Sequence, residues 1–136
     1  MRKPAAHFHL PGLFEFYEFY RAFLPLYRAH RAYFYDWCEI ASIYGAPEGC
    51  IWGGGRVGSG TAGAQEVLAL MQDFGISARL TFSNCLLRPE HLIDRPCNAL
   101  CRAFSDSAGP QNGVIVHSEL LLTYLKKHYP LSLIHI

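Results

Sequence analysis

The chain has 136 residues, of which 51% are hydrophobic and 17% are charged, and its formal net charge is +1. This apolar share is enough to build a core and excludes a disordered chain, while the length corresponds to one domain. The basic residues are scattered along the sequence, so it carries no nucleic-acid-binding footprint.

The cysteine pattern and the hydrophobic pattern also exclude several classes of protein. Five cysteines at irregular spacing argue against a disulfide framework and favour a reducing cytoplasm. The basic start is not followed by a sustained apolar run, so we expect no signal peptide. Charged residues interrupt the most apolar stretch, residues 13–37, and no membrane span is expected.

Residues 1–12 contain two prolines and predict a flexible lead-in. His7 and His9 in this segment could ligate a metal together, but a flexible terminus is the simpler interpretation.

Residues 13–48 predict an aromatic-rich helical arm. Apolar residues recur at helical spacing from Leu13 to Leu24, and Pro25 predicts a break before a second helix that runs to about Tyr35. The aromatic stripe either packs on the sheet or docks a partner, and packing is favoured because such stripes bury a large area. Residues 39–47 predict a short strand or an extended turn.

Residues 49–130 predict a repeating strand–helix unit. The expected strands are 50–53, 76–82 and 113–117, and the expected helices are 63–74, 89–106 with an interruption near Pro96, and 119–128. Such alternation predicts an α/β fold with three or four parallel strands in the order 1-2-3-4 and helices on the outer face. A full (β/α) barrel needs about 250 residues, so we expect part of a barrel whose exposed strand edges favour self-association.

The last six residues, Leu131 to Ile136, fit a further strand. They also resemble a translated sequencing adaptor, so we expect an artefactual tail, a different native sequence after Pro130 and a truncated chain.

A glycine-rich cluster follows the first of these predicted strands. In parallel sheets the ligand binds beyond the carboxyl ends of the strands. Gly53 to Gly58 matches the dinucleotide pattern G-x-G-x-x-G, but the helix does not begin at the third glycine. We therefore favour a generic anion or backbone-contact loop that includes Gly54, Gly55 and Arg56, and equally a sharp turn that only glycines allow. A nucleotide-binding domain is the weaker alternative.

Two more polar clusters end the later strands. Asn84, after Ser83, either orients a substrate through its amide or caps the next helix. His117 could act as an acid, a base or a metal ligand, while Ser118 and Glu119 also fit a helix cap and a first-turn acid. The catalytic candidates are His117, Glu119 and Asn84, the substrate-binding candidates are Gly54, Gly55, Arg56, Ser83 and Ser118, and no metal site is expected.

The cysteines are interpreted as structural. Cys97 and Cys101 lie one helical turn apart, but no second pair with matching spacing lies nearby, so core packing is favoured over metal binding. Cys38, Cys50 and Cys85 are also interpreted as buried thiols, and Cys85 is the one to test for reactivity.

The segment from Gly49 through Pro130 resembles the N-terminal half of the collagenase-like peptidase superfamily of TIM-barrel proteins. The motifs are Ile51-Trp52-Gly53-Gly54, then Ile76-Ser77-Ala78-Arg79-Leu80-Thr81-Phe82, then Gly113-Val114-Ile115-Val116-His117-Ser118 with Leu120-Leu121 and a helix ending in Tyr129-Pro130. The resemblance implies an enzyme of hydrolase type, or one serving RNA or quinone modification, whose small-molecule or peptide substrate binds at the carboxyl ends of the strands.

Several members of that superfamily carry an iron–sulfur cluster on cysteines of the C-terminal half. The resemblance therefore leaves the cofactor of this chain unknown and implies that the fragment alone is inactive. The alternative is a non-enzymatic α/β module that docks a partner through its aromatic arm.

Overall fold

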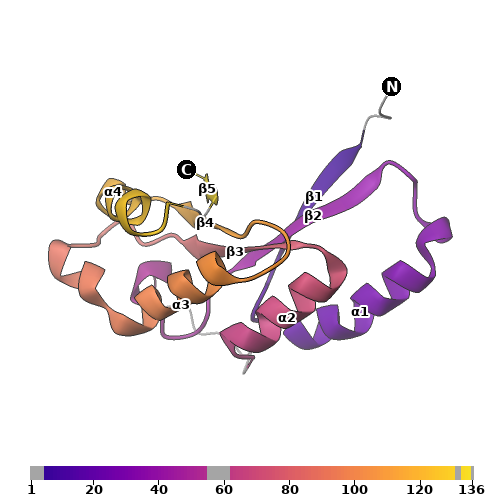
Figure 1. Cartoon of the computed structure of the whole chain (residues 1–136), viewed down its shortest axis with the longest axis horizontal. Coiled ribbons are helices and arrows are strands. Elements are labelled where there is room, and N and C mark those ends of the chain that lie inside the picture. Colours follow the sequence, from indigo (N-terminus) through magenta and orange to yellow (C-terminus); the bar gives the residue numbers. More distant parts are fainter. Residues whose placement is uncertain (1–4, 55–61, 131–132, 136) are drawn as a thin grey trace.

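The computed structural model describes residues 5–54, 62–130 and 133–135. Five parallel strands form one open sheet in the order β1-β2-β3-β4-β5 (Figure 1). The strands are β1 (Ala6–Pro11), β2 (Cys38–Gly45), β3 (Ser77–Phe82), β4 (Gly113–Val116) and β5 (Leu133–His135). The predicted α/β class and the sequential parallel order are confirmed, and the sheet is consistent with part of a (β/α) barrel.

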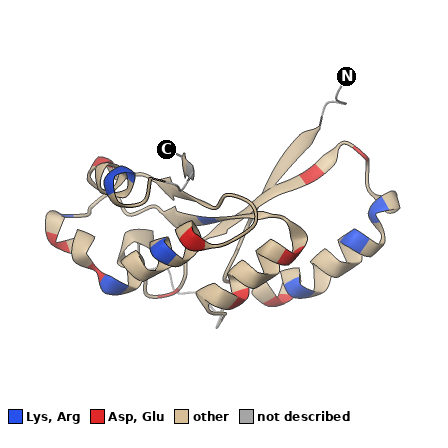
Figure 2. Cartoon of the chain, in the orientation of Figure 1, with Lys and Arg blue, Asp and Glu red and all other residues tan. Residues whose placement is uncertain are grey.

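Four α-helices connect or follow the strands in the described part of the chain. They are α1 (Tyr17–Ala29), α2 (Ala64–Phe74), α3 (Arg95–Asp106) and α4 (Glu119–His128), and short 3-10 turns cover Arg31–Tyr33, Ile51–Gly53 and Pro89–Ile93. Figure 1 shows α1, α2 and α3 side by side along one face of the sheet, with α4 near β4 and β5. Figure 2 shows both positive and negative residues on α1, α3 and α4, whereas the charged residues of α2 are acidic.

One face of the sheet is packed against the helices. Ile43, Ala78 and Leu80 lie on this face, together with Phe82, Val114 and Val116, and all six are buried. They meet buried residues of the helices such as Leu24 and Met71. Each large side chain buried in this way stabilises the fold by about 1.5–3 kcal/mol, so this layer holds the sheet and the helices together.

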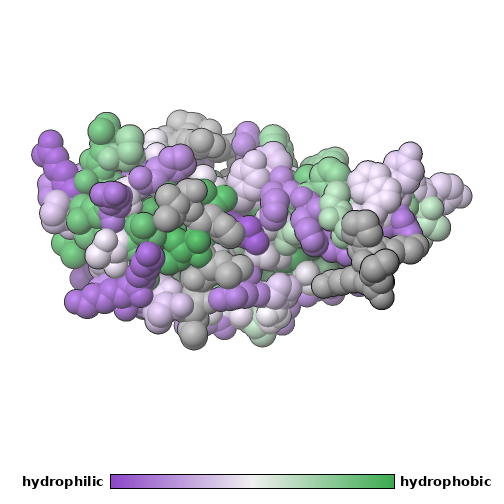
Figure 3. Space-filling model, turned by 90° about the horizontal axis from the view of Figure 1, so that it is seen from above, coloured by the Kyte–Doolittle hydropathy of each residue, from purple (hydrophilic) through white to green (hydrophobic). Residues whose placement is uncertain are grey.

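The opposite face, called the open face below, carries polar side chains. Strand pairing places His9 beside Ser42, Tyr44 beside Arg79, and Thr81 beside Ile115. Figure 3 views the molecule from above Figure 1 and shows hydrophilic and hydrophobic residues mixed on the visible surface. In a closed (β/α) barrel the equivalent face points into the barrel.

Residues 6–11 are not a loose lead-in but form β1, which makes five strands rather than three or four. Ala6 N donates a hydrogen bond to Trp37 O at 2.7 Å, and the strand runs parallel to β2. The alternation of His7 and His9 with apolar neighbours was the signal for this strand. As a result, α1 is the crossover between two parallel strands and not a separate arm.

The break predicted at Pro25 is also wrong. Helix α1 continues through Pro25 to Ala29. Tyr20 and Leu24 bury the part before the proline, and after it the Tyr27 hydroxyl donates to Cys38 O at 3.3 Å and the Arg28 guanidinium lies 3.9 Å from the Phe74 ring centroid. Pro25 has no N–H to donate to the backbone carbonyl of Arg21. Both residues are exposed, so water can hydrate that carbonyl.

The strand predicted at 50–53 is a 3-10 turn instead. Trp52 is fully buried there, its Nε1 donates a hydrogen bond to His91 O at 2.8 Å, and its ring packs edge-on against Phe82. The segment is therefore apolar because it is a loop anchored in the core, and not because it is a strand. Residues 39–47, for which a short strand or an extended turn was predicted, lie in β2 and take the place beside β3 that was predicted for 50–53.

The remaining predicted elements agree closely with the structure. Strands 76–82 and 113–117 and helices 63–74 and 119–128 match β3, β4, α2 and α4. The interruption near Pro96 is present, because the Asp94 side chain accepts a hydrogen bond from Cys97 N at 2.9 Å and begins α3 there. Strand β5 falls in the C-terminal segment after Pro130.

Candidate functional site

The carboxyl ends of β3 and β4 meet at one edge of the sheet, called the carboxyl edge below. His117 N donates a hydrogen bond to Phe82 O at 3.3 Å, so the segments that follow the two strands are in direct contact. Thr81 pairs with Ile115 in the sheet, and Ser83 and His117 each come two residues later. The predicted gathering of these two clusters at one edge is therefore observed.

The glycine turn at 51–54 is fixed to the same edge. Ser83 Oγ donates to Gly53 O at 3.3 Å, and a Cβ added to Gly54 would lie 3.8 Å from Ser83 Oγ. Gly53 approaches Ala46 so closely that a Cβ would lie 2.9 Å from the Ala46 Cβ, and Gly54 has a φ of 84°. Both positions therefore require glycine, one for space and one for backbone conformation.

Asn84 holds this turn in place. Its Nδ2 donates to Ile51 O at 2.9 Å, its Oδ1 accepts from Leu86 N at 2.9 Å, and its own N donates to Trp52 O at 3.1 Å. The amide is thus engaged by backbone groups on both sides. This geometry favours a positioning role for Asn84 over direct contact with a substrate, and it is not the helix cap considered from the sequence.

His117 is the candidate with a free side chain. The residue is exposed, and its imidazole makes no hydrogen bond, ion pair or ring contact with any residue that the structure describes. An exposed imidazole on the segment whose backbone bonds to Phe82, the residue before Ser83, can give a proton to a bound molecule or take one from it.

Ser118 and Glu119 take the roles of a helix start. Ser118 Oγ accepts a hydrogen bond from Leu121 N at 3.2 Å and caps α4, and Ser118 is 7% exposed. Glu119 lies in the first turn of α4, where a carboxylate is favoured by the helix dipole. Its side chain lines a shallow groove of about 400 Å³ that also includes Leu92 and Thr123.

Gly55 and Arg56 lie outside the described residues, as does the rest of 55–61. The anion-loop interpretation of the glycine cluster and the dinucleotide pattern both extend into this segment.

Three of the cysteines form a buried group beside the glycine turn. Cys50 Sγ and Cys97 Sγ lie 3.1 Å apart, and Cys101 packs in the same core. The hydrogen bond between the first two thiols lowers the pKa of Cys50 and raises the pKa of Cys97, while burial raises the pKa of Cys101 to about 12. Within the described ranges, no group of three or more potential ligands could hold a metal ion.

The prediction that Cys38 and Cys85 are buried is wrong. Cys85 is exposed and Cys38 is half-buried, because the first lies in the loop after β3 and the second begins β2. Cys85 is thus the accessible thiol of the loop after the carboxyl edge.

The polar open face was not identified from the sequence. His9 Nδ1 lies 2.6 Å from Ser42 Oγ, and Arg79 lies half-buried in the middle of β3. The available signal was the alternation within 77–82, where three polar residues alternate with Ala78, Leu80 and Phe82. The open face continues from the carboxyl edge down the sheet.

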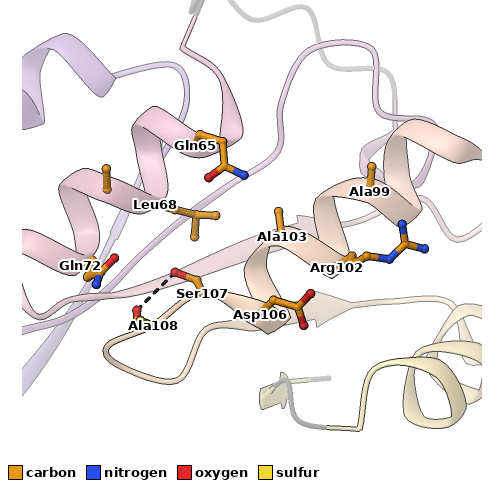
Figure 4. Close-up of a pocket in the computed structure, with 10 residues that line it drawn as sticks. Gln65, Leu68, Gln72, Ala99, Arg102, Ala103, Asp106, Ser107 and Ala108 are labelled. Atoms are coloured by element: carbon orange, nitrogen blue, oxygen red, sulfur yellow. Dashed lines mark hydrogen bonds between the residues drawn. The ribbon is translucent and has the colours of Figure 1, made fainter.

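A groove on the helix side is chemically poorer than the carboxyl edge. It lies between α2 and α3, has a volume of about 530 Å³, and includes Gln65, Gln72, Arg102 and Asp106 (Figure 4). Its remaining lining is mostly alanine and leucine, and it includes no histidine or cysteine.

Comparison of the chain with protein-family models, curated proteins and solved structures finds no match. Among the described residues, no helix has the length and apolar character needed to cross a membrane.

Proposed function

We propose that this chain is part of a TIM-barrel enzyme whose substrate binds at the carboxyl edge, similar to the collagenase-like peptidases that residues 49–130 resemble. The observation that carries the proposal is the contact between the segments after β3 and β4: the His117 backbone bonds to Phe82, and Ser83, the next residue, lies against the turn at Gly53 and Gly54. Ligands of parallel α/β sheets bind at this edge, and these residues are the ones that reach it.

Each of these residues has a distinct role in the proposal. His117 is the general acid or base, Ser83 orients a small-molecule or peptide substrate through its hydroxyl, and the turn at Gly54 lets backbone groups approach that substrate closely. Gly55 and Arg56 are the further substrate-binding residues of the proposal, and Glu119 is a carboxylate two residues after His117 in the sequence. The cofactor is left open, and five free thiols favour the cytoplasm as the compartment.

The test uses the full-length protein that contains this segment. Gelatin peptides are incubated with the wild type, and new peptide termini are counted by mass spectrometry. We expect His117→Ala to lower turnover by about 10²–10⁴-fold without a change in Tm, because loss of an acid–base group has effects of this size. Ser118→Ala is the matched control, which should lower Tm through loss of the α4 cap and leave turnover nearly unchanged.

Two results would overturn the proposal. Absence of peptide cleavage by the wild type would remove the peptidase assignment. A His117→Ala variant with lower Tm and full turnover would show that the histidine is structural.

A second candidate function is partner docking through the aromatic segment at 13–37. Leu13, Phe14, Tyr20 and Leu24 pack into the core, but Tyr33 is 87% exposed and Tyr35 is 70% exposed. The exposed members also include Phe16, Phe19, Phe34 and Trp37. Such a concentration of exposed aromatic side chains is typical of interaction surfaces.

Docking and self-association can be separated by one set of variants. The triple variant Phe19→Ser, Tyr33→Ser and Tyr35→Ser should abolish partner binding by the aromatic segment. Self-association through the edge strands β1 and β5 would persist in that variant and be visible by analytical ultracentrifugation. Equal partner binding by the wild type and the triple variant would rule out this surface.

A further inference from the structure

We propose that the open face binds an oxyanion, a carboxylate or a phosphate, through Arg79 and Thr81, and that this anion is the charged end of the substrate. The second half of this inference rests on the proposed function, whereas anion binding itself does not.

Arg79 forms no ion pair with any residue that the structure describes. Its one hydrogen bond among the described residues runs from Nε to Ser77 Oγ at 3.4 Å, which leaves the two terminal nitrogens of the guanidinium free. Burial lowers the pKa of Arg79, and no neighbouring carboxylate counteracts this shift. A half-buried guanidinium is stabilised by bidentate contact with an oxyanion, so the position favours such a ligand.

The strand neighbours of Arg79 in the described part of the chain supply no acid. Arg79 pairs with Tyr44 on β2 and with Gly113 on β4, and the glycine has no side chain to cover the guanidinium. The open-face carboxylate of β2 is Glu39, which lies five residues before Tyr44, roughly 16 Å along the strand. Glu39 Oε2 is also 3.4 Å from His7 Nδ1 and is therefore already paired.

Thr81 provides the second, independent observation. Its Oγ1 is buried and has no hydrogen-bond partner within the described part of the chain. Leaving a buried hydroxyl without a partner costs about 1–3 kcal/mol, and the acceptor oxygen of a ligand that displaces the side chains covering it would remove that cost. Thr81 is two residues after Arg79, so both side chains lie on the same face of β3.

The location connects this pair to the carboxyl edge. Ser83 follows Arg79 by four residues on β3, roughly 13 Å along the strand. A substrate of ordinary size can therefore place its anion at Arg79 and Thr81 while the reacting group lies near Ser83 and His117. The inference thus adds a substrate class, molecules with a carboxylate or phosphate, to the proposed function.

The test measures binding of inorganic phosphate and of acetate to the full chain. Calorimetry gives the affinity, and the Nε–Hε resonance of Arg79 in an NMR titration identifies the residue that is contacted. We expect saturable binding of at least one anion by the wild type, and the stronger of the two identifies the ligand as phosphate or carboxylate. Arg79→Gln should weaken binding at least tenfold, and Thr81→Val should weaken it less.

Matched controls keep the result interpretable. Arg102→Gln removes an exposed arginine on the helix side and should leave anion binding unchanged. Arg79→Lys keeps the charge and serves if Arg79→Gln does not fold, and it should bind more weakly than the wild type because lysine cannot form the bidentate contact. His117→Ala should retain anion binding, so failure of the catalytic proposal would not mimic failure of this one.

The inference is overturned if the wild type shows no saturable binding of either anion. Equal affinities of the wild type and Arg79→Gln would also overturn it, as would an equal loss in Arg79→Gln and Arg102→Gln.

Discussion

The two faces of the sheet differ sharply although the same strands build both. On the helix side of β3, Ala78, Leu80 and Phe82 are fully buried among apolar neighbours. On the open face of the same strand, Arg79 has no counterion and Thr81 has no hydrogen-bond partner among the described residues. The apolar core therefore lies on one face of β3, and the polar side chains lie on the other.

The largest effect should come from the helix side. Phe82→Ala removes a fully buried ring that packs edge-on against Trp52, and we expect a loss of about 3–5 kcal/mol in the free energy of unfolding. Urea denaturation followed by circular dichroism measures this loss. A cost below about 1 kcal/mol would mean that the ring is not part of the core.

A hydroxyl placed on the helix side should also be costly. Val114→Thr keeps the shape of a side chain that is 3% exposed but adds a polar group with no partner. We expect a loss of about 1–3 kcal/mol in the free energy of unfolding, from the same denaturation experiment. An unchanged stability would contradict the view that this face is dry and apolar.

Alkaline pH should destabilise the helix side through Cys101. Burial raises the pKa of this thiol from 9.0 to about 12, so the folded state holds the proton more tightly than the unfolded state. Its contribution is complete below pH 9 and is lost as the pH rises toward 12, with a slope of up to about 1.4 kcal/mol per pH unit. Denaturation at pH 8, 9, 10 and 11 measures the slope.

Cys101→Ala is the control for that experiment. The variant should be less stable at every pH and should lose the part of the slope that belongs to this proton. An unchanged slope would assign the alkaline effect to other groups, such as Tyr20 and Tyr129, whose pKa values burial also raises.

The smallest effect should come from the open face. Thr81→Val removes a buried hydroxyl without a described partner, so the free energy of unfolding should stay the same or rise by up to about 1 kcal/mol. This change is the reverse of Val114→Thr on the neighbouring strand, and the two measured together compare the two faces directly. A loss above about 1 kcal/mol in Thr81→Val would show that the hydroxyl is satisfied in the folded protein.

Local sequence signals were sufficient to predict an element whose burial pattern and cap lie within a few consecutive residues. The apolar run at 113–116 followed by Ser118 predicted both β4 and the start of α4, because a buried strand and a serine cap are each readable in a few residues. The carboxyl edge was predictable for the same reason, since each polar cluster directly follows a strand.

Features that depend on contacts between distant segments were not predictable. The turn at Ile51–Gly53 looked like a strand because Trp52 is buried by Phe82 and anchored by His91, which lie 30 or more residues later. The open face was missed because the pairing of His9 with Ser42, and of Tyr44 with Arg79, depends on the register between strands. A single sequence contains the alternation but not that register.

The hydrogen bonds of Asn84 fix the turn at 51–54 whatever the length of the segment that follows it. The backbone partners of Asn84, Ile51 and Trp52, lie upstream of Gly54, so the hydrogen bonds are complete before the chain enters 55–61. Insertions or deletions after Gly54 should therefore leave the hydrogen bonds of Asn84, and with them the turn at 51–54, in place. The turn at 51–54 is thus fixed by the end of β3 and not by the segment that follows it.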